Sequence, residues 1–176
     1  MDAMIVVDMQ AGLLNGAPKH DLSGVIARIN RLAAATRKQG GRVVFIQHCG
    51  PDGEAFAPGA PGWDFLPELD RRDSDIVVPK SLNDAFAGTA LKAVLDGIGA
   101  RRLLIAGWAT DFCVDATLRG ATAQDYDVVA VADGHTCSDR PHLAAPEVIR
   151  HHNWVWSGLI ARRSVRVMST AELLPA

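Results

Sequence analysis

The hydrophobic pattern of the chain alternates between short apolar runs and longer segments with helical periodicity. The short runs are rich in Val, Ile and Leu, as expected of buried β-strands. They lie at residues 3–8, 42–48, 75–80, 101–107, 127–133 and 165–169. Between them, apolar residues recur at helical spacing, which predicts helices over residues 21–39, 88–99, 112–124 and 142–160.

This alternation predicts an α/β fold. Continuous apolar strands separated by helices are typical of a parallel sheet with helices on both faces, and right-handed crossovers make such a sheet doubly wound. The chain has 176 residues, so we expect a single domain over residues 1–176. Residues 49–73 are rich in Gly and Pro, which predicts a long loop. Loops of this length in compact domains tend to be functional or mobile.

Composition narrows the possible partners. The formal net charge is −2 and no Lys/Arg stripe is present, so we do not expect nucleic acid as the main partner. No apolar run approaches the roughly 20 residues of a membrane span, and the first residues lack a basic signal-peptide region. Three cysteines without a CxxC pair argue against a disulfide framework, so we expect a cytoplasmic location.

Ligands of such sheets bind beyond the carboxyl ends of the strands, where this chain carries three reactive side chains. Asp8 ends the first apolar run, Lys80 ends the third, and Cys113 follows the fourth. Together they offer a base, a positive charge and a nucleophile. Each also has an ordinary interpretation, because Asp8 can cap a loop, Lys80 can be a solvated strand end, and Cys113 can be a small buried residue.

The residues before Cys113 predict the start of a helix. Thr110 or Asp111 is a suitable N-cap, which places Cys113 in the first helical turn. A helix N-terminus and a nearby lysine both lower a thiol pKa, so we expect a reactive thiolate. The chain contains no GxGxxG, GxxxxGK[ST], GxSxG or HExxH motif, which removes most of the usual α/β functions.

The stretches IVVDMQAGLL, VVPKSLNDAFAGTAL, GWATDFCVDATLRGATAQDYDVVAVADGHT and VRVMST resemble the isochorismatase-like cysteine hydrolases. This family includes nicotinamidases, carbamoyl-amide hydrolases and isochorismatase. The resemblance implies a three-layer α/β/α sandwich with a six-stranded parallel sheet. It also implies an Asp8, Lys80 and Cys113 catalytic triad, a cis peptide bond between Trp108 and Ala109, and a homo-oligomer.

The activity implied by the resemblance is hydrolysis of a carbon–nitrogen bond in a small amide or ureido compound. Cys113 would attack the carbonyl carbon, and the backbone N–H groups of Ala109 and Cys113 would form the oxyanion hole. Two alternatives stay open. One is isochorismatase-type ether or ester hydrolysis, and the other is a catalytically silent member of the fold that binds a ligand.

The chain departs from the nicotinamidases after its second apolar run. Those enzymes bind a metal through an Asp-x-His pair, whereas FIQHCGPDGEAF contains His48 without that pair. We therefore expect no metal and no cofactor, and we disfavour nicotinamide as the substrate.

Polar and aromatic residues near the triad are candidates for a substrate pocket, although each aromatic residue can equally be core or lid packing. They are Gln10, Trp63, Asn83, Phe86, Trp108 and Phe112. His135 follows the fifth run, and there we expect a hydrogen bond in a turn. The aromatic residues of the segment 142–160, including Trp154 and Trp156, predict a contact with a second subunit.

Overall fold

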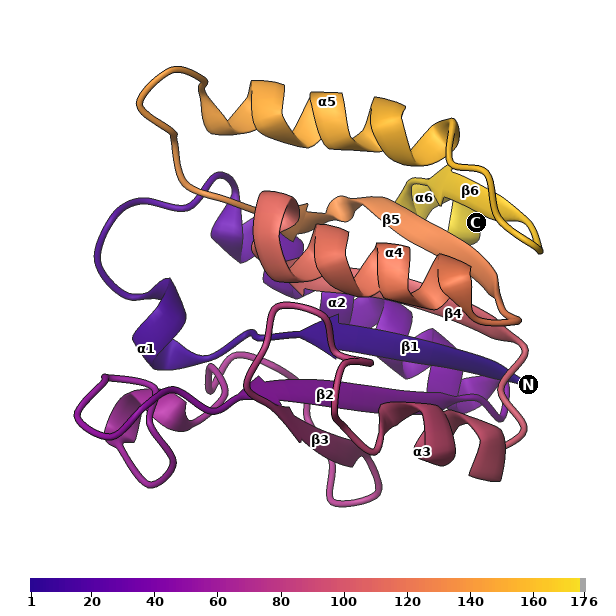
Figure 1. Ribbon diagram of the computed structural model, residues 1–176, viewed down its shortest axis with the longest axis horizontal. Coiled ribbons are helices and arrows are strands. Elements are labelled where there is room, and N and C mark those ends of the chain that lie inside the picture. The colour runs from indigo at the N-terminus through magenta and orange to yellow at the C-terminus, as the bar shows by residue number, and fades with distance from the viewer. Residues whose placement is uncertain (175–176) are drawn as a thin grey trace.

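A six-stranded parallel sheet forms the centre of the structure, a computed structural model that describes residues 1–174. The strands are β1 (Asp2–Val7), β2 (Arg42–His48), β3 (Ile76–Lys80), β4 (Arg102–Trp108), β5 (Asp127–Thr136) and β6 (Val165–Met168). Their order is β3-β2-β1-β4-β5-β6, so the sheet is wound outward from its centre in two directions (Figure 1). Each predicted apolar run forms one strand, and β5 continues three residues beyond the predicted run.

Helices cover both faces of the sheet, which makes the fold a three-layer α/β/α sandwich (Figure 1). The four predicted helices form with shorter ends, as α2 (Leu22–Lys38), α3 (Leu91–Gly97), α4 (Asp115–Ala123) and α5 (Ala145–Ser157). Short elements that the pattern did not predict are α1 (Ala11–Leu14), η1 (Pro61–Trp63) and α6 (Thr170–Leu173). The start of the predicted helix 112–124 forms a separate π-helical turn, η2 (Thr110–Val114). No helix of the described residues is long and apolar enough to cross a membrane.

Two apolar layers hold the sandwich together. Side chains of successive strand residues point to opposite faces. On β1, Ile5 and Val7 pack with the layer of α3, α4 and α5, whereas Met4 and Val6 pack with the layer of α2. The central strand is therefore buried on both faces, which explains its continuous apolar sequence.

The aromatic residues of α5 divide between the core and the surface. Trp156 is fully buried in the layer of α3 and α4, whereas Trp154 is 74% exposed. The expected contact with a second subunit stays a prediction, and it now concerns Trp154 rather than Trp156.

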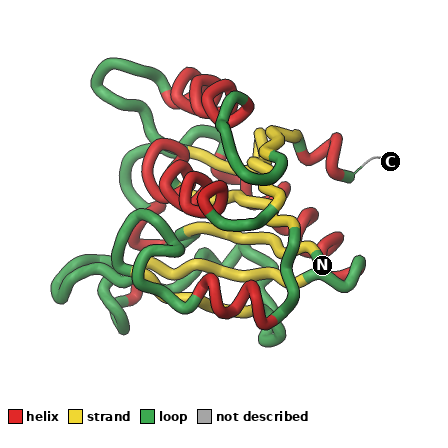
Figure 2. Tube along the Cα trace, turned by 45° about the vertical axis from the view of Figure 1, so that its right-hand side comes forward, coloured by secondary structure: helices red, strands yellow, loops and turns green. Residues whose placement is uncertain are grey.

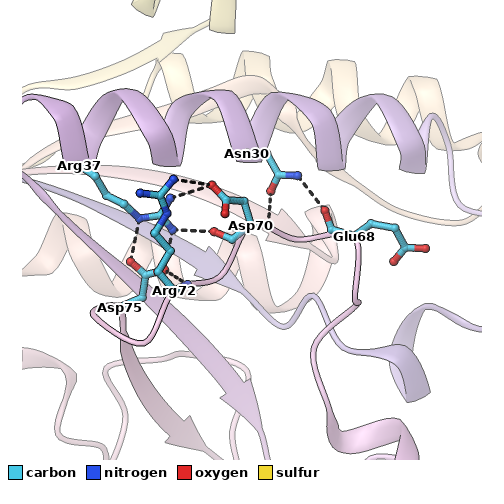
Figure 3. Close-up of polar contacts among 6 residues, drawn as sticks. All are labelled: Asn30, Arg37, Glu68, Asp70, Arg72 and Asp75. Atoms are coloured by element: carbon cyan, nitrogen blue, oxygen red, sulfur yellow. Dashed lines mark hydrogen bonds and ion pairs between the residues drawn. The ribbon is translucent and has the colours of Figure 1, made fainter.

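The long loop between β2 and β3 is fastened to α2 by a group of polar contacts (Figure 3). The guanidinium of Arg37 donates to both carboxylate oxygens of Asp75, at 2.9 and 2.5 Å. Asn30 donates to the carbonyl of Glu68 and accepts from the backbone N–H of Asp70, each at 2.8 Å. These contacts fix the returning half of the loop along α2.

The winding directions diverge between β1 and β4, which pair in parallel at the centre of the sheet. Such a switch point leaves a crevice beyond the carboxyl ends of the two strands. Long loop segments gather at this end of the sheet (Figure 2). Gly107 allows the close approach of β4 to β1 here, because its φ is +127° and a Cβ would lie 2.2 Å from the carbonyl oxygen of Val7.

Candidate active site

A cavity of about 240 Å³ opens beyond the carboxyl ends of β1, β2 and β4. Its lining combines apolar and aromatic side chains with a few polar groups, as is usual for small-molecule sites. The lining residues are Asp8, Leu13, His48, Phe56, Asn83, Trp108, Ala109, Phe112, Cys113 and Arg140.

The three reactive side chains predicted from the strand ends meet at this cavity. Lys80 Nζ lies 2.6 Å from Asp8 Oδ2 and 3.4 Å from Cys113 Sγ. The ammonium also donates to the carbonyl of Leu82 at 2.9 Å and lies 3.0 Å from His48 Nδ1. The sheet order explains the convergence, because β1 is flanked by β2 and β4 and β3 lies just beyond β2.

The carboxylate of Asp8 is buried but lacks well-formed hydrogen bonds. Although it forms an ion pair with Lys80, neither oxygen has a hydrogen-bond partner of good geometry among the described residues. Burial raises the pKa of Asp8, and the positive charge of Lys80 opposes that rise. A desolvated carboxylate with free lone pairs is well suited to accept a proton.

Cys113 lies in the turn η2, ahead of α4. The structure shows no side-chain cap at this turn, so the predicted N-cap at Thr110 or Asp111 is wrong. Both side chains have other partners. Thr110 Oγ1 lies 2.8 Å from His135 Nδ1, and Asp111 accepts two hydrogen bonds of 2.7 Å from Arg140.

The expected lowering of the Cys113 pKa is also wrong. Burial raises the pKa of Cys113 to about 12, and the negative charge of Asp8 adds to the rise. Lys80 lowers this pKa, but by less than the other two causes raise it. The thiol is therefore protonated at neutral pH, and the carboxylate of Asp8, within 4.8 Å of it, is a basic group beside the sulfur.

The backbone just before η2 has an unusual geometry. The peptide bond between Trp108 and Ala109 is cis. The carbonyl of Ala109 accepts hydrogen bonds from the N–H groups of Phe112 and Val114, at 3.0 and 3.1 Å. Ala109 and Cys113, the two residues expected to form an oxyanion hole, both line the cavity.

Three of the six predicted pocket residues line the cavity, namely Asn83, Trp108 and Phe112. The sulfur of Cys113 lies 3.7 Å from Asn83 Oδ1. The guanidinium of Arg140 lies over the Phe112 ring, 5.3 Å from its centroid. These side chains lie around Cys113.

The other three predicted pocket residues do not line the cavity. Gln10 is fully buried and joins the end of β2 to η1, because its amide donates to the carbonyls of His48 and Trp63 and accepts from the His48 N–H. The Trp63 indole N–H is buried outside the cavity. Phe86 packs against the apolar core beside Tyr126. The amide of Gln10 thus fastens η1 to β2 and does not face the cavity.

Four lining residues were not predicted as pocket residues: Leu13, His48, Phe56 and Arg140. His48 carried a signal, because it ends the second apolar run. The remaining three come from α1 and from loops, whose paths the hydrophobic pattern does not specify. The Phe56 ring contacts the His48 ring at a centroid distance of 5.5 Å.

The side chains of Asp8, His48 and Cys113 are close enough to bind a metal, since one donor atom of each lies within 4.8 Å of the others. The ammonium of Lys80 already lies among these donors, at 2.6, 3.0 and 3.4 Å. A second cation there would be repelled by this charge. Burial and the Lys80 charge lower the pKa of His48, which keeps its ring neutral beside the ammonium.

Comparison with known proteins gives a consistent result. A family model described as "Isochorismatase domain" matches residues 2–157. A streptothricin hydrolase of Streptomyces noursei is 35% identical over 149 residues, which cover 84% of this chain and 53% of the relative. The chain thus spans about half the length of that relative.

A ureidoacrylate amidohydrolase of Pseudomonas syringae pv. syringae is 32% identical over 182 residues, covering 82% of this chain and 72% of the relative. The crystal structure of an isochorismatase family protein superimposes with a TM-score of 0.86 at 28% identity. That match covers 96% of this chain and 98% of the other. The shared architecture therefore extends over nearly the whole chain.

Proposed function

The chain belongs to the isochorismatase family, and on this basis we propose that it hydrolyses the carbon–nitrogen bond of a small amide or ureido compound through Cys113. The observation that carries the proposal is the contact of the Lys80 ammonium with both the Asp8 carboxylate and the Cys113 sulfur at one cavity. The names of two relatives, streptothricin hydrolase and ureidoacrylate amidohydrolase, support a hydrolase and, for the second, an amide bond.

The raised pKa of Cys113 determines how the first step proceeds. Because the thiol is protonated at rest, its proton moves to Asp8 as the sulfur attacks the carbonyl carbon of the amide. Lys80 stabilises the negative charge on the carboxylate and on the developing thiolate. The substrate carbonyl oxygen becomes an oxyanion, and the backbone N–H groups of Ala109 and Cys113 stabilise it.

The tetrahedral intermediate then collapses. Asp8 returns the proton to the amide nitrogen, the carbon–nitrogen bond breaks, and ammonia or an amine leaves while a thioester remains on Cys113. Asp8, again ionised, takes a proton from water as that water attacks the thioester. Collapse of the second intermediate releases the acid, and the sulfur takes back its proton from Asp8.

The cavity size supports a small substrate. Its volume of about 240 Å³ lies below the roughly 300–1,000 Å³ of sites for drug-sized ligands. Aromatic rings of Trp108 and Phe112 provide flat apolar contacts beside the nucleophile. A compact amide or ureido acid fits this space better than a large amide.

The test is an ammonia-release assay on a panel of small amides, carbamoyl compounds, ureido acids and nicotinamide. We expect release from at least one ureido or amide compound, loss of release in Cys113→Ala, and retention in Cys49→Ala. Intact mass spectrometry should show an acyl adduct on the wild-type protein and none on Cys113→Ala.

Two results would oppose the proposal. Undiminished turnover by Cys113→Ala would exclude the thiol as nucleophile. Cleavage of an isochorismate-like ether without ammonia release would indicate the ether hydrolase alternative, and the absence of any turnover would indicate a ligand-binding member of the fold.

A further inference from the structure

We propose that His135 is a positioning residue that holds the Cys113 turn in place by accepting a hydrogen bond from Thr110. The inference rests on the proposed function, because the turn acts through Cys113. His135 lies on β5 and Thr110 is the first residue of η2. Their side chains are 2.8 Å apart, between Nδ1 and Oγ1, and both residues are buried.

The hydrogen bonds around His135 determine which ring nitrogen carries the proton. The amide nitrogen of Asn153, on α5, donates to the carbonyl of Ala132 at 2.9 Å. This orients Asn153 Oδ1 toward His135 Nε2, at 3.1 Å. An amide oxygen only accepts, so Nε2 must be protonated. In the neutral ring Nδ1 is then an acceptor, and the hydroxyl of Thr110 donates to it.

The surroundings of His135 keep the ring neutral. Burial lowers the pKa of His135 to about 4. The other charged or titratable groups that influence it are His152 on α5, which lowers this pKa, and Asp133 on β5, which raises it. The Trp156 indole packs against the His135 ring in a T-shaped arrangement, at a centroid distance of 4.9 Å. Near neutral pH the ring therefore retains the lone pair that Thr110 needs.

This chain of hydrogen bonds joins η2 to β5 and α5, three segments that are distant in sequence. Cys113 lies in the same turn as Thr110, with its sulfur 3.4 Å from Lys80 Nζ. A loosened turn would change that distance and the direction of the thiol toward Asp8. His135 itself does not line the cavity, so it acts through Thr110 and not on the substrate.

Two substitutions at His135 separate this role from simple packing. Asparagine places an oxygen near the position of Nδ1 and keeps an acceptor for Thr110. Glutamine reaches toward Asn153 but loses that acceptor. We expect His135→Gln to lower kcat by roughly 10²-fold with KM little changed, and His135→Asn to retain most activity. Equal losses in the two variants, or no loss in His135→Gln, would overturn the proposal.

Substitutions at Thr110 test the same bond from the other side. Thr110→Val removes the hydroxyl at constant shape, and we expect the same loss of kcat as in His135→Gln. Thr110→Ser restores the donor and should recover most of that loss. The double variant of Thr110→Val with His135→Gln should lose no more than either single variant, because both remove one bond. Additive losses would contradict this model. His151→Ala, an exposed histidine on α5, is the matched control.

Two measurements need no turnover, so failure of the proposed function remains distinguishable. In protein labelled with ¹⁵N-histidine, the signal lost in His135→Asn should report a neutral ring protonated at Nε2; protonation at Nδ1 would overturn the inference. The alkylation rate of Cys113 by iodoacetamide should change by the same factor in His135→Gln and Thr110→Val. It should stay near the wild-type rate in His135→Asn and Thr110→Ser, and a rate equal in all four variants would refute the role.

Discussion

The ammonium of Lys80 lies 2.6 Å from Oδ2 of Asp8, and neither side chain has any exposed surface. Removing two charges from water is costly, so such a pair is retained where both partners are needed together. Here the pair places a carboxylate with unused lone pairs beside the sulfur of Cys113. The burial that raises the pKa of Asp8 also raises the pKa of Cys113 and keeps the thiol protonated at neutral pH.

Breaking this pair should destabilise the fold. Lys80→Met leaves the Asp8 carboxylate buried without its counter-charge, which raises the pKa of Asp8 further. We expect the free energy of unfolding to fall by about 3–5 kcal/mol, measured by urea denaturation at neutral pH. Lys92→Met, which removes an exposed lysine paired with Asp96 on the surface, is the control and should change little. A Lys80→Met protein as stable as the wild type would show that the Asp8–Lys80 ion pair does not stabilise the fold.

The thiol of Cys113 should react slowly with iodoacetamide at neutral pH, since only the thiolate is alkylated. With the pKa of Cys113 raised to about 12, the rate should keep rising with pH beyond the range of an ordinary thiol, whose pKa is about 8.5. Asp8→Asn removes the neighbouring negative charge, so alkylation should become faster while turnover is lost.

Peptide mass spectrometry assigns the alkylated residue, and Cys113→Ala measures the background from Cys49 and Cys137. Fast alkylation of the wild-type Cys113 at pH 7 would indicate a preformed thiolate. In that case Asp8 would not be needed to remove the thiol proton.

The free energy of unfolding should decrease as the pH falls, because His135 is protonated in the unfolded chain before it is protonated in the folded protein. Its pKa is 6.5 in the unfolded chain and about 4 when folded. Between these values the unfolded chain binds a proton that the folded protein does not, so stability decreases as pH falls from about 6.5 and levels off below about 4. The contribution is about 3 kcal/mol. It is measured as the difference between wild type and His135→Gln in urea unfolding from pH 7 to 4, and a constant difference would contradict it.

The ion pair between Arg37 on α2 and Asp75 in the β2–β3 loop should stabilise the fold. Arg37→Ala removes the counter-charge of the Asp75 carboxylate, which keeps the hydrogen bond from the backbone N–H of Arg72, and that side chain is only 2% exposed. We expect a loss of about 3 kcal/mol in the free energy of unfolding. Arg31→Ala, an exposed residue of the same helix, provides the comparison and should be near neutral. Equal stability of the two variants would show that Asp75 finds another partner or reaches solvent.

Removal of divalent metals should leave the proposed amide hydrolysis unchanged. The Lys80 ammonium already contacts the carboxylate, imidazole and thiol that a metal would need. We therefore expect equal rates of ammonia release before and after dialysis against EDTA, with metal content measured by mass spectrometry. A loss of activity that zinc or manganese restores would show that a metal takes part.

The position and type of the main elements follow from the sequence. Strands β1 to β6 coincide with the six apolar runs. The inner strands β1, β2, β4 and β5 are buried along most of their length and therefore need apolar residues at nearly every position. The same local reasoning places Asp8, Lys80 and Cys113 at carboxyl ends of strands, and the parallel order of the sheet then brings those ends to one edge.

Only the tertiary structure determined the pKa of Cys113 and which residues line the cavity. The pKa of Cys113 depends on burial and on Asp8, a residue more than 100 positions away in the sequence, so the expectation from a helix N-terminus had the wrong sign. Phe56 and Arg140 reach the cavity from loops, where no repeating pattern specifies the path of the backbone. Hydrophobic periodicity reports which local segments are covered, whereas charge interactions and loop contacts depend on distances that exist only after the chain has folded.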